Sequence, residues 1–222
     1  MPAPETPIVH LADPDSTADL RTFLARARSV HDGDVSLMMR GLAMAVYVPV
    51  IVPQEFGEST PTILGMRAFR LAQPAEGTAV FPLGALTDRL ARMSPIETAL
   101  QLPPAESQAA WAGILPPVSG WTEAGEYDAE TLRAAAEAGT RAVVDALPEN
   151  SGQPVLATVR SRIWSSPLGT GPAPELPTGA AFAAKTLGFV PGDGTVRVLS
   201  QGPWHRLSTP AGHVLVRQGA RL

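Results

Sequence analysis

An apolar run at positions 41–52, GLAMAVYVPVIV, constrains the fold of this chain more than any other segment. The run is well short of the roughly 20 residues that a helix needs to cross a bilayer, and Pro49 interrupts it. In an extended chain both of its faces would be mostly apolar, which is typical of a strand that is covered on both sides. Because proline cannot donate to a sheet ladder, we expect a bulge or a sheet edge at Pro49.

The residues before this run predict a tail and a helix. Residues 1–14 contain four prolines and no periodicity, so we expect a flexible tail there. Ser16 and Asp19 have the spacing of a capping box, and the apolar residues that follow recur with helical period, so a helix is predicted over residues 17–30.

The residues on either side of the apolar run predict an N-terminal α+β unit at positions 15–102, with an antiparallel or mixed sheet and flanking helices. We expect a hairpin with its tight turn at Arg40 and Gly41, because glycine accepts a positive φ. Two more strands are predicted at residues 62–71 and 78–81. A second helix should follow, with Pro82 in its first position.

The remaining residues predict a proline-rich connector at 103–120 and a C-terminal unit at 121–222. Asp128 is expected to cap a long helix, AETLRAAAEAGTRAVVDAL, and two shorter helices should follow it. Three strands, TVRVLS, PWHRLS and HVLVRQ, then form an antiparallel meander. The sequence therefore predicts the α+β class, and three helices before a hairpin is also the order of a winged helix.

Cysteine is absent from all 222 residues, which excludes disulfides, thiolate metal sites and catalytic thiols. The N-terminal residues lack a basic segment followed by an apolar stretch, so no signal peptide is predicted. We therefore expect a soluble cytoplasmic protein that has no membrane partner.

Charged residues form 17% of the chain, against about 25% in an ordinary globular protein, and 45% of the residues are hydrophobic. Surface with so little charge is often covered by a second copy of the same chain, so we expect a homodimer. Coding bias is the alternative explanation, because Lys185 is the only lysine among the 17 basic residues, as in a high-GC genome.

The net charge of −4 is distributed unevenly along the sequence. Residues 1–150 carry 10 arginines and 19 acidic residues, a net −9, and residues 151–222 carry 7 basic and 2 acidic residues, a net +5. Such asymmetry indicates an anionic partner such as nucleic acid, or attraction between the two halves of the protein.

The stretches SGWTEAGEYDAETLRAAAEAGTRAV, GAAFAAKTLGF and WHRLSTPAGHVLVRQ resemble those of a family of uncharacterised actinobacterial proteins. The resemblance covers most of the chain and agrees with the coding bias. That family has no assigned activity, so the resemblance implies no role for any residue.

The last two predicted strands supply the candidate ligand or nucleic-acid contact. If residues 209–212 form the turn, Ser208 pairs with His213, and alternation along the strands places five polar or aromatic side chains on one face. Arginine forks bind phosphate and indoles stack on bases, so this face could contact nucleic acid. The five residues are Trp204, Arg206, Ser208, His213 and Arg217.

The same register separates the two histidines of this hairpin. His205 falls on the opposite face from His213, so a shared metal ion is not expected. The helix before the meander offers only Lys185 and Thr186 to a DNA groove, which counts against a recognition helix.

Other groups have simpler structural explanations. Lys185 could be a desolvated amine for Schiff-base chemistry, but its stem is expected to lie on apolar surface with the ammonium in water. The acidic run from Glu123 to Glu130 lacks the spacing of a calcium loop and is explained by helix capping. His31, Asp32 and Asp34 are expected to form a polar turn. No catalytic, cofactor-binding or metal-binding residue is therefore predicted.

Three functions follow from these observations, in decreasing order of support. The first is a non-enzymatic interaction or regulatory protein. The second is a nucleic-acid-binding protein that uses its basic C-terminal half. The third is a small-molecule enzyme with its site between the two units, where pockets tend to form.

Overall fold

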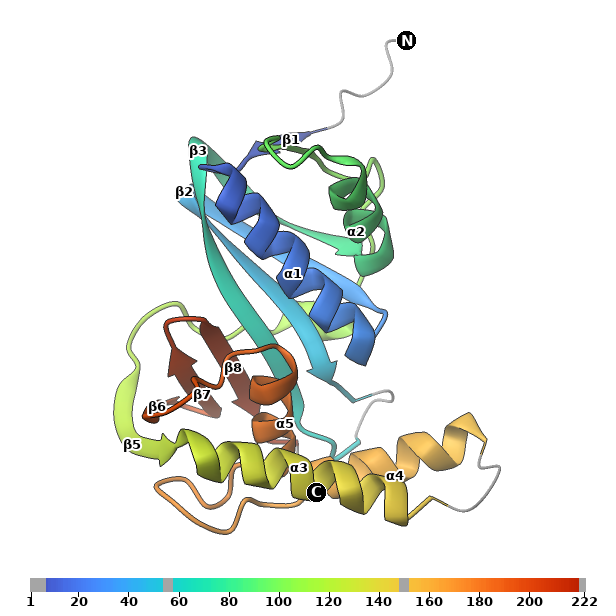
Figure 1. Cartoon of the computed structure of the whole chain (residues 1–222), viewed down its shortest axis with the longest axis vertical. Coiled ribbons are helices and arrows are strands. Elements are labelled where there is room, and N and C mark those ends of the chain that lie inside the picture. The colour runs from blue at the N-terminus through green and yellow to red at the C-terminus, as the bar shows by residue number, and fades with distance from the viewer. Residues whose placement is uncertain (1–6, 54–57, 148–151, 220–222) are drawn as a thin grey trace. The chain divides into compact units, whose positions relative to one another are not determined.

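The computed structural model describes residues 7–53, 58–147 and 152–219, and it divides into two compact units (Figure 1). Unit 1 comprises Met1–Pro49 and Met66–Leu115, and unit 2 comprises Val50–Gly65 and Pro116–Leu222. The fold is α+β, as the sequence predicts. The elements of the first part of the chain are β1 (Ile8–His10), α1 (Pro14–Val30), β2 (Asp34–Ile51), β3 (Thr62–Pro82), α2 (Leu83–Arg92), β4 (Ala99–Gln101) and the 3-10 helix η1 (Ala110–Gly113). Those of the second part are β5 (Thr122–Asp128), α3 (Ala129–Asp145), α4 (Gln153–Ser165), α5 (Thr178–Thr186), β6 (Thr195–Gln201), β7 (Trp204–Thr209) and β8 (Gly212–Arg217).

The strands form two antiparallel sheets. The larger has the order β2-β3-β8-β7-β6-β5, and the smaller pairs β1 with β4. Strand β1 lies in the segment that the sequence predicts as a flexible tail, so that expectation does not hold for residues 8–10. Val9 pairs with Leu100 and is buried, and this apolar contact explains why the segment is ordered.

Helix α1 begins three residues earlier than the sequence predicts. Its N-cap is Asp13, whose Oδ1 accepts a hydrogen bond from the backbone N of Ser16 at 2.7 Å, and Pro14 follows the cap. Proline suits this position because its missing N–H would have no helical partner. Ser16 is therefore not the cap. The expected apolar face is confirmed, since Leu20 and Phe23 are buried.

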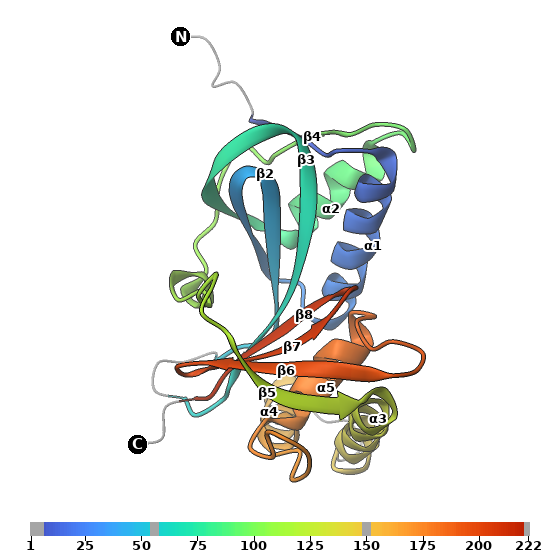
Figure 2. The same ribbon diagram turned by 90° about the vertical axis from the view of Figure 1, so that its left-hand side faces the viewer.

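The separate two-residue turn predicted at Arg40 and Gly41 is not found, because β2 is one strand through both residues. Gly41 has a φ of 57°, its backbone N donates to Glu76 Oε1 at 2.8 Å, and the long strand β2 bends back on itself (Figures 1 and 2). The strands predicted at residues 62–71 and 78–81 are likewise one strand, β3. A glycine with positive φ thus lies within a strand, as in a bulge.

The apolar run is covered on both faces from Met44 to Val50, as predicted, whereas Leu42 is 47% exposed. Consecutive residues of a strand point to opposite sides, and Val46, Tyr47 and Val48 are all buried. Strand β2 lies at one edge of the larger sheet. Of the bulge or sheet edge expected at Pro49, the sheet edge is observed.

Helices α1 and α2 lie side by side in unit 1 (Figures 1 and 2). Leu83, Leu86 and Leu90 form the buried face of α2, as their spacing predicts. Arg21 of α1 donates to the backbone O of Leu90 from Nε at 3.2 Å and from Nη2 at 2.9 Å. Nη2 is also 3.3 Å from the backbone O of Met93. A side chain of α1 therefore satisfies carbonyl groups at the end of α2, which have no partner within the helix.

In unit 2 the three helices lie on one face of strands β5 to β8 (Figure 2). The side chains that β6, β7 and β8 turn toward this layer include Val198, Leu207 and Val214, all buried. Helix α5 meets them with an alanine-rich surface, which allows close packing of helix on sheet, and it contacts β8 and α3.

The C-terminal meander forms as predicted, and Asp128 is the N-cap of α3, although its side chain makes no capping hydrogen bond. Strand β5 was not expected. It pairs with β6 from Thr122 to Asp128, so the hairpin β7-β8 is part of a sheet and not a separate wing. The connector contains one short helix, η1.

No helix in the described ranges is both long enough and apolar enough to span a bilayer.

Candidate functional site

The five candidate residues lie on one face of the hairpin β7-β8, in the predicted register. Ser208 pairs with His213 and Trp204 with Arg217. Arg206 lies between Trp204 and Ser208 on the same side of β7 because side chains alternate along a strand. We call this surface, formed by Trp204, Arg206, Ser208, His213 and Arg217, the outer face.

The indole of Trp204 is 3% exposed, so it packs within the protein and is not open to a stacking ligand. The guanidinium of Arg217 lies 5.8 Å from the centre of this ring. A second stack involves a residue that sequence reasoning did not include in the face. Arg206 lies 4.7 Å from the ring centre of Trp121, whose Nε1 donates to the backbone O of Pro117 at 2.9 Å. Both arginines therefore cover aromatic rings of their own unit.

His213 and Ser208 form a polar pair across the hairpin, with 3.0 Å between Nδ1 and Oγ. Burial, followed by the positive charge of Arg206, lowers the pKa of His213 from 6.5 to about 4. The imidazole is therefore neutral at neutral pH, and the positive charge of the outer face comes from its arginines.

His205 points away from the outer face, as the register predicts. Its Nε2 lies 3.2 Å from Glu175 Oε1, in the loop that precedes α5. Because the two imidazoles occupy opposite faces, they do not share a site. Within the described ranges, no cluster of three or more histidine and acidic side chains is arranged to hold a metal ion.

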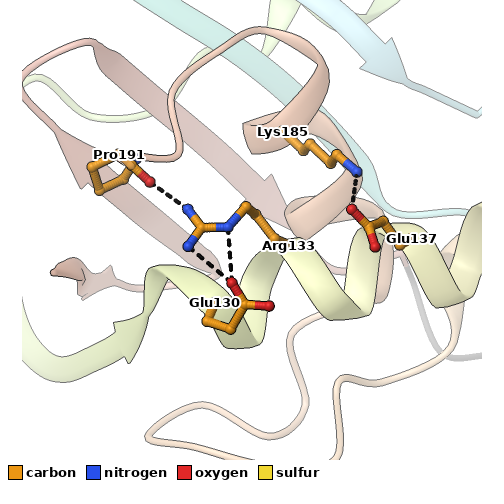
Figure 3. A network of polar contacts seen from close by, with 5 residues as sticks. All are labelled: Glu130, Arg133, Glu137, Lys185 and Pro191. Atoms are coloured by element: carbon orange, nitrogen blue, oxygen red, sulfur yellow. Dashed lines mark hydrogen bonds and ion pairs between the residues drawn. The ribbon is translucent and has the colours of Figure 1, made fainter. Parts of the chain in front are cut away.

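Glu123, at the start of the acidic run, and Glu137 of α3 pair with basic residues from later in the chain. Arg197 Nε lies 3.2 Å from Glu123 Oε1, and Lys185 Nζ lies 2.7 Å from Glu137 Oε1. Lys185 is thus an ion-pair partner with a partly exposed side chain. Figure 3 shows this pair on α5 and α3.

A second ion pair lies on α3 itself and is also drawn in Figure 3. Arg133 contacts Glu130 Oε2 through Nε at 3.1 Å and Nη2 at 3.0 Å, and its Nη1 donates to the backbone O of Pro191 at 2.5 Å. This bond ties the loop before β6 to α3. Glu123, Glu130 and Glu137 therefore have structural partners within unit 2.

Folding removes the charge asymmetry of the sequence. Unit 1 contains 8 basic and 10 acidic residues, and unit 2 contains 9 and 11, so each has a net charge of −2. The acidic segment at 121–150 and the basic segment that follows it belong to the same unit. The sequence left two explanations for the asymmetry, an anionic partner and attraction between the acidic and basic parts of the chain. The structure supports the second.

His31, Asp32 and Asp34 do not converge. Asp32 pairs with Arg28, at 3.3 Å from Oδ1 to Nε, and Asp34 Oδ1 accepts from Ser107 Oγ at 2.5 Å. The two carboxylates therefore serve different partners, and the polar turn that the sequence predicts is the better description.

Sequence reasoning missed a cavity of about 470 Å³ between α1 and α2. It lies in unit 1, and we call it the α1–α2 groove. Small residues at helical spacing, Ala25 and Ser29 on α1, were the signal in the sequence. The lining residues are Arg21, Ala25, Arg28, Ser29, Thr87, Asp88, Leu90 and Ala91.

Two domain families divide the chain. Residues 5–113 match a domain of unknown function, DUF8010, and residues 116–221 match a second one, DUF8185. A search among curated protein sequences gave no match.

Bacterial sliding clamps have a similar fold. The DNA polymerase sliding clamp of Caulobacter crescentus is 12% identical, with a TM-score of 0.53 over 97% of this chain and 66% of the clamp. The DnaN sliding clamp, DNA polymerase III subunit beta, of Bartonella birtlesii is 10% identical, with a TM-score of 0.57 over 97% of this chain and 65% of the clamp. This chain thus spans slightly less than two thirds of the length of the clamps. At such low identities the likeness is one of fold alone. The protein therefore joins two domains of unknown function, DUF8010 and DUF8185, in a sliding-clamp-like fold.

Proposed function

We propose that this protein is a non-enzymatic interaction or regulatory protein of clamp-like architecture, which acts by binding other macromolecules. The observation that carries the proposal is the similarity of fold to sliding clamps over 97% of the chain. The side chains that suggested chemistry in the sequence support it, because they serve structural contacts: Lys185 pairs with Glu137, and Trp204 is buried.

The first partner is a second copy of the chain, in a homodimer. Low charge density supports this, and exposed apolar side chains on each unit provide positions at which to test it. Ile96 of unit 1 is 81% exposed, and Val144 of unit 2, near the end of α3, is 65% exposed. The cytoplasm and an actinobacterial source belong to the same proposal, and they rest on the composition and sequence resemblance described above.

Sedimentation velocity between about 1 and 50 µM tests self-association, since a Kd in the micromolar range shifts the population across it. We expect a dimer or a larger closed assembly. Val144→Ser and Ile96→Ser remove one exposed apolar side chain each, and the variant that weakens association locates the interface. Gly192→Ala is the control, because a Cβ at this position meets nothing within 4 Å. A monomer throughout the range would contradict the proposal.

The absence of enzymatic activity needs a separate test. Turnover in an unbiased substrate screen that a single polar-to-alanine change abolished would contradict it and would favour the small-molecule enzyme. We expect no such activity.

A second candidate function is nucleic-acid binding through the C-terminal half. It is favoured by Arg206 and Arg217 on the outer face and by the name of the similar proteins, which are DNA polymerase clamps. The burial of Trp204 and the net charge of −2 on unit 2 count against it, so any contact would rest on the two arginines.

Fluorescence anisotropy of labelled DNA and RNA at about 50 and 200 mM salt tests this candidate, because phosphate contacts make affinity steeply salt-dependent. If it holds, Arg206→Gln with Arg217→Gln abolishes binding. Arg160→Gln with Arg162→Gln, on α4, is the matched control because it removes the same charge elsewhere in unit 2. Absence of binding at the lower salt would exclude the candidate.

A further inference from the structure

The α1–α2 groove runs between two antiparallel helices and has an arginine at each end. Arg21 reaches the last turn of α2 through its bonds to Leu90, whereas Arg28, two turns later on α1, donates from Nη1 to Thr87 Oγ1 at 2.9 Å. The two helices are therefore antiparallel along the groove. Seven residues of helix separate the two arginines, so they mark its two ends about 10 Å apart.

Small side chains line the groove between and beside the two arginines. Ala25 lies between Arg21 and Arg28 on α1, Ser29 follows Arg28, and Ala91 follows Leu90 on α2. None of these small side chains extends far from its helix, and the resulting cavity of about 470 Å³ is within the size range of small-molecule sites. The groove therefore suits a narrow apolar group.

The two ends differ in charge. Arg28 is neutralised by two carboxylates, since its Nε lies 3.3 Å from Asp32 Oδ1 and its Nη1 lies 3.6 Å from Asp88 Oδ1. Arg21 contacts only backbone carbonyls, and no carboxylate in the described part of the chain pairs with it. The Arg21 end of the groove therefore retains a positive charge. The guanidinium can donate a charge-assisted hydrogen bond to an anion, which is stronger than a hydrogen bond between neutral groups.

We propose that the α1–α2 groove binds a small amphipathic anion, with the anionic group at Arg21 and the apolar body along Ala25 and Ala91. A carboxylate on an aliphatic chain has this chemistry. The guanidinium of Arg21 is held in place by Leu90 and Met93, so little freedom is lost when the anion binds. This site belongs to unit 1 alone and does not depend on the proposed function.

Octanoate is the probe, and amide NMR spectra of the whole chain are the measurement. We expect saturable shift changes at Ala25, Ser29, Thr87 and Ala91. The neutral analogue 1-octanol should bind at least about tenfold more weakly, because it lacks the charge-assisted contact. Shifts confined to other parts of the protein, or equal binding of the two probes, would overturn the proposal.

Two variants with matched controls locate the site. Ala91→Leu fills the groove and should weaken octanoate binding at least about tenfold, whereas Ala134→Leu, at an exposed alanine of helix α3 in unit 2, should not. Arg21→Gln should remove the preference for octanoate over 1-octanol, and Arg40→Gln is its control. Arg21→Gln also removes hydrogen bonds to α2 and could unfold the protein. If Arg21→Gln does not fold, the test rests on the binding affinity of Ala91→Leu. Unchanged affinity in Ala91→Leu would place the ligand elsewhere.

Discussion

Arg197 on β6 and Glu123 on β5 form an ion pair, with Nε 3.2 Å from Oε1, although 74 positions separate them in the sequence. The pair joins the basic C-terminal segment to the acidic run before α3. In the sequence, the basic segment resembles an anion-binding signature. In the fold, part of its positive charge pairs with carboxylates of the same unit.

Arg197→Gln should change the free energy of unfolding by less than about 1 kcal/mol, because both side chains are 56% exposed and water screens their attraction. Urea denaturation measures the change. A loss above about 2 kcal/mol would mean that the pair is worth more than an exposed pair ordinarily is.

The Lys185–Glu137 pair predicts a pH effect in the acid range. The hydrogen bond and charge of Lys185 hold the pKa of Glu137 below its usual 4.5. The pair therefore stabilises the fold at pH values above 4.5, and this contribution is lost as the pH falls through the lower pKa of the folded state. Carboxyl NMR titration should show the Glu137 midpoint return toward 4.5 in Lys185→Gln. An unchanged midpoint would contradict the assignment.

His213 predicts a second pH effect, in the range from 6.5 to about 4. Its pKa is lowered in the folded protein, so the unfolded chain binds more protons there and stability falls as the pH falls. The slope contributed by one such group is at most about 1.4 kcal/mol per pH unit. Urea unfolding of the wild type and His213→Gln across this range measures it. The same slope in both proteins would show that another group is responsible.

Gly139 of α3 allows the close approach of α4. A Cβ at this position would collide with the ring of Trp164, which stacks on Phe182 at 4.4 Å between ring centres. Alanine usually stabilises a helix relative to glycine by about 1 kcal/mol, but here overpacking should reverse the sign and cost about 1–3 kcal/mol. Thermal and urea unfolding of Gly139→Ala test this, with Gly192→Ala as the control in open space. Stabilisation by Gly139→Ala would contradict this packing.

Tyr127 holds the loop before α5. Its hydroxyl lies 2.8 Å from the backbone O atoms of Thr170 and Ala173, and burial raises its pKa. Tyr127→Phe leaves these acceptors without their donor and should cost about 1–2 kcal/mol in urea unfolding. Hydrogen exchange of the loop amides should increase as well. Unchanged stability together with unchanged exchange would show that other contacts order the loop.

The parts of the fold that the sequence predicts are those with a strong local signal. The two-residue turn at Pro210 and Ala211 sets the register of β7 and β8. The pairing partners of Ser208 and Trp204 follow from that register. Helical spacing similarly predicts the buried faces of α1 and α2.

The errors arise where a tertiary contact decides the outcome. The carboxylate of Glu76 bonds to the backbone N of Gly41, 35 positions away, where the sequence predicted a separate two-residue turn. Strand β5 has only Tyr127 buried, because an edge strand with exposed carboxylates has no apolar alternation to detect. The α1–α2 groove depends on a helix pairing that local patterns do not encode.

The same holds for the candidate site. Its membership follows from strand register, but the stack of Arg206 on Trp121 joins residues 85 positions apart and could not be predicted from local spacing. The burial of Trp204 also depends on the rest of the fold, and it turns an apparent stacking platform into part of the core.

The bond from Arg21 to the end of α2 also bears on the order of folding. At 10 residues α2 is too short to persist alone in water, and the side chain that satisfies its final carbonyls lies 69 positions away on α1. Helix α2 should therefore consolidate only after α1 has docked. During synthesis α1 leaves the ribosome first, so the later helix emerges beside a partner that is already present.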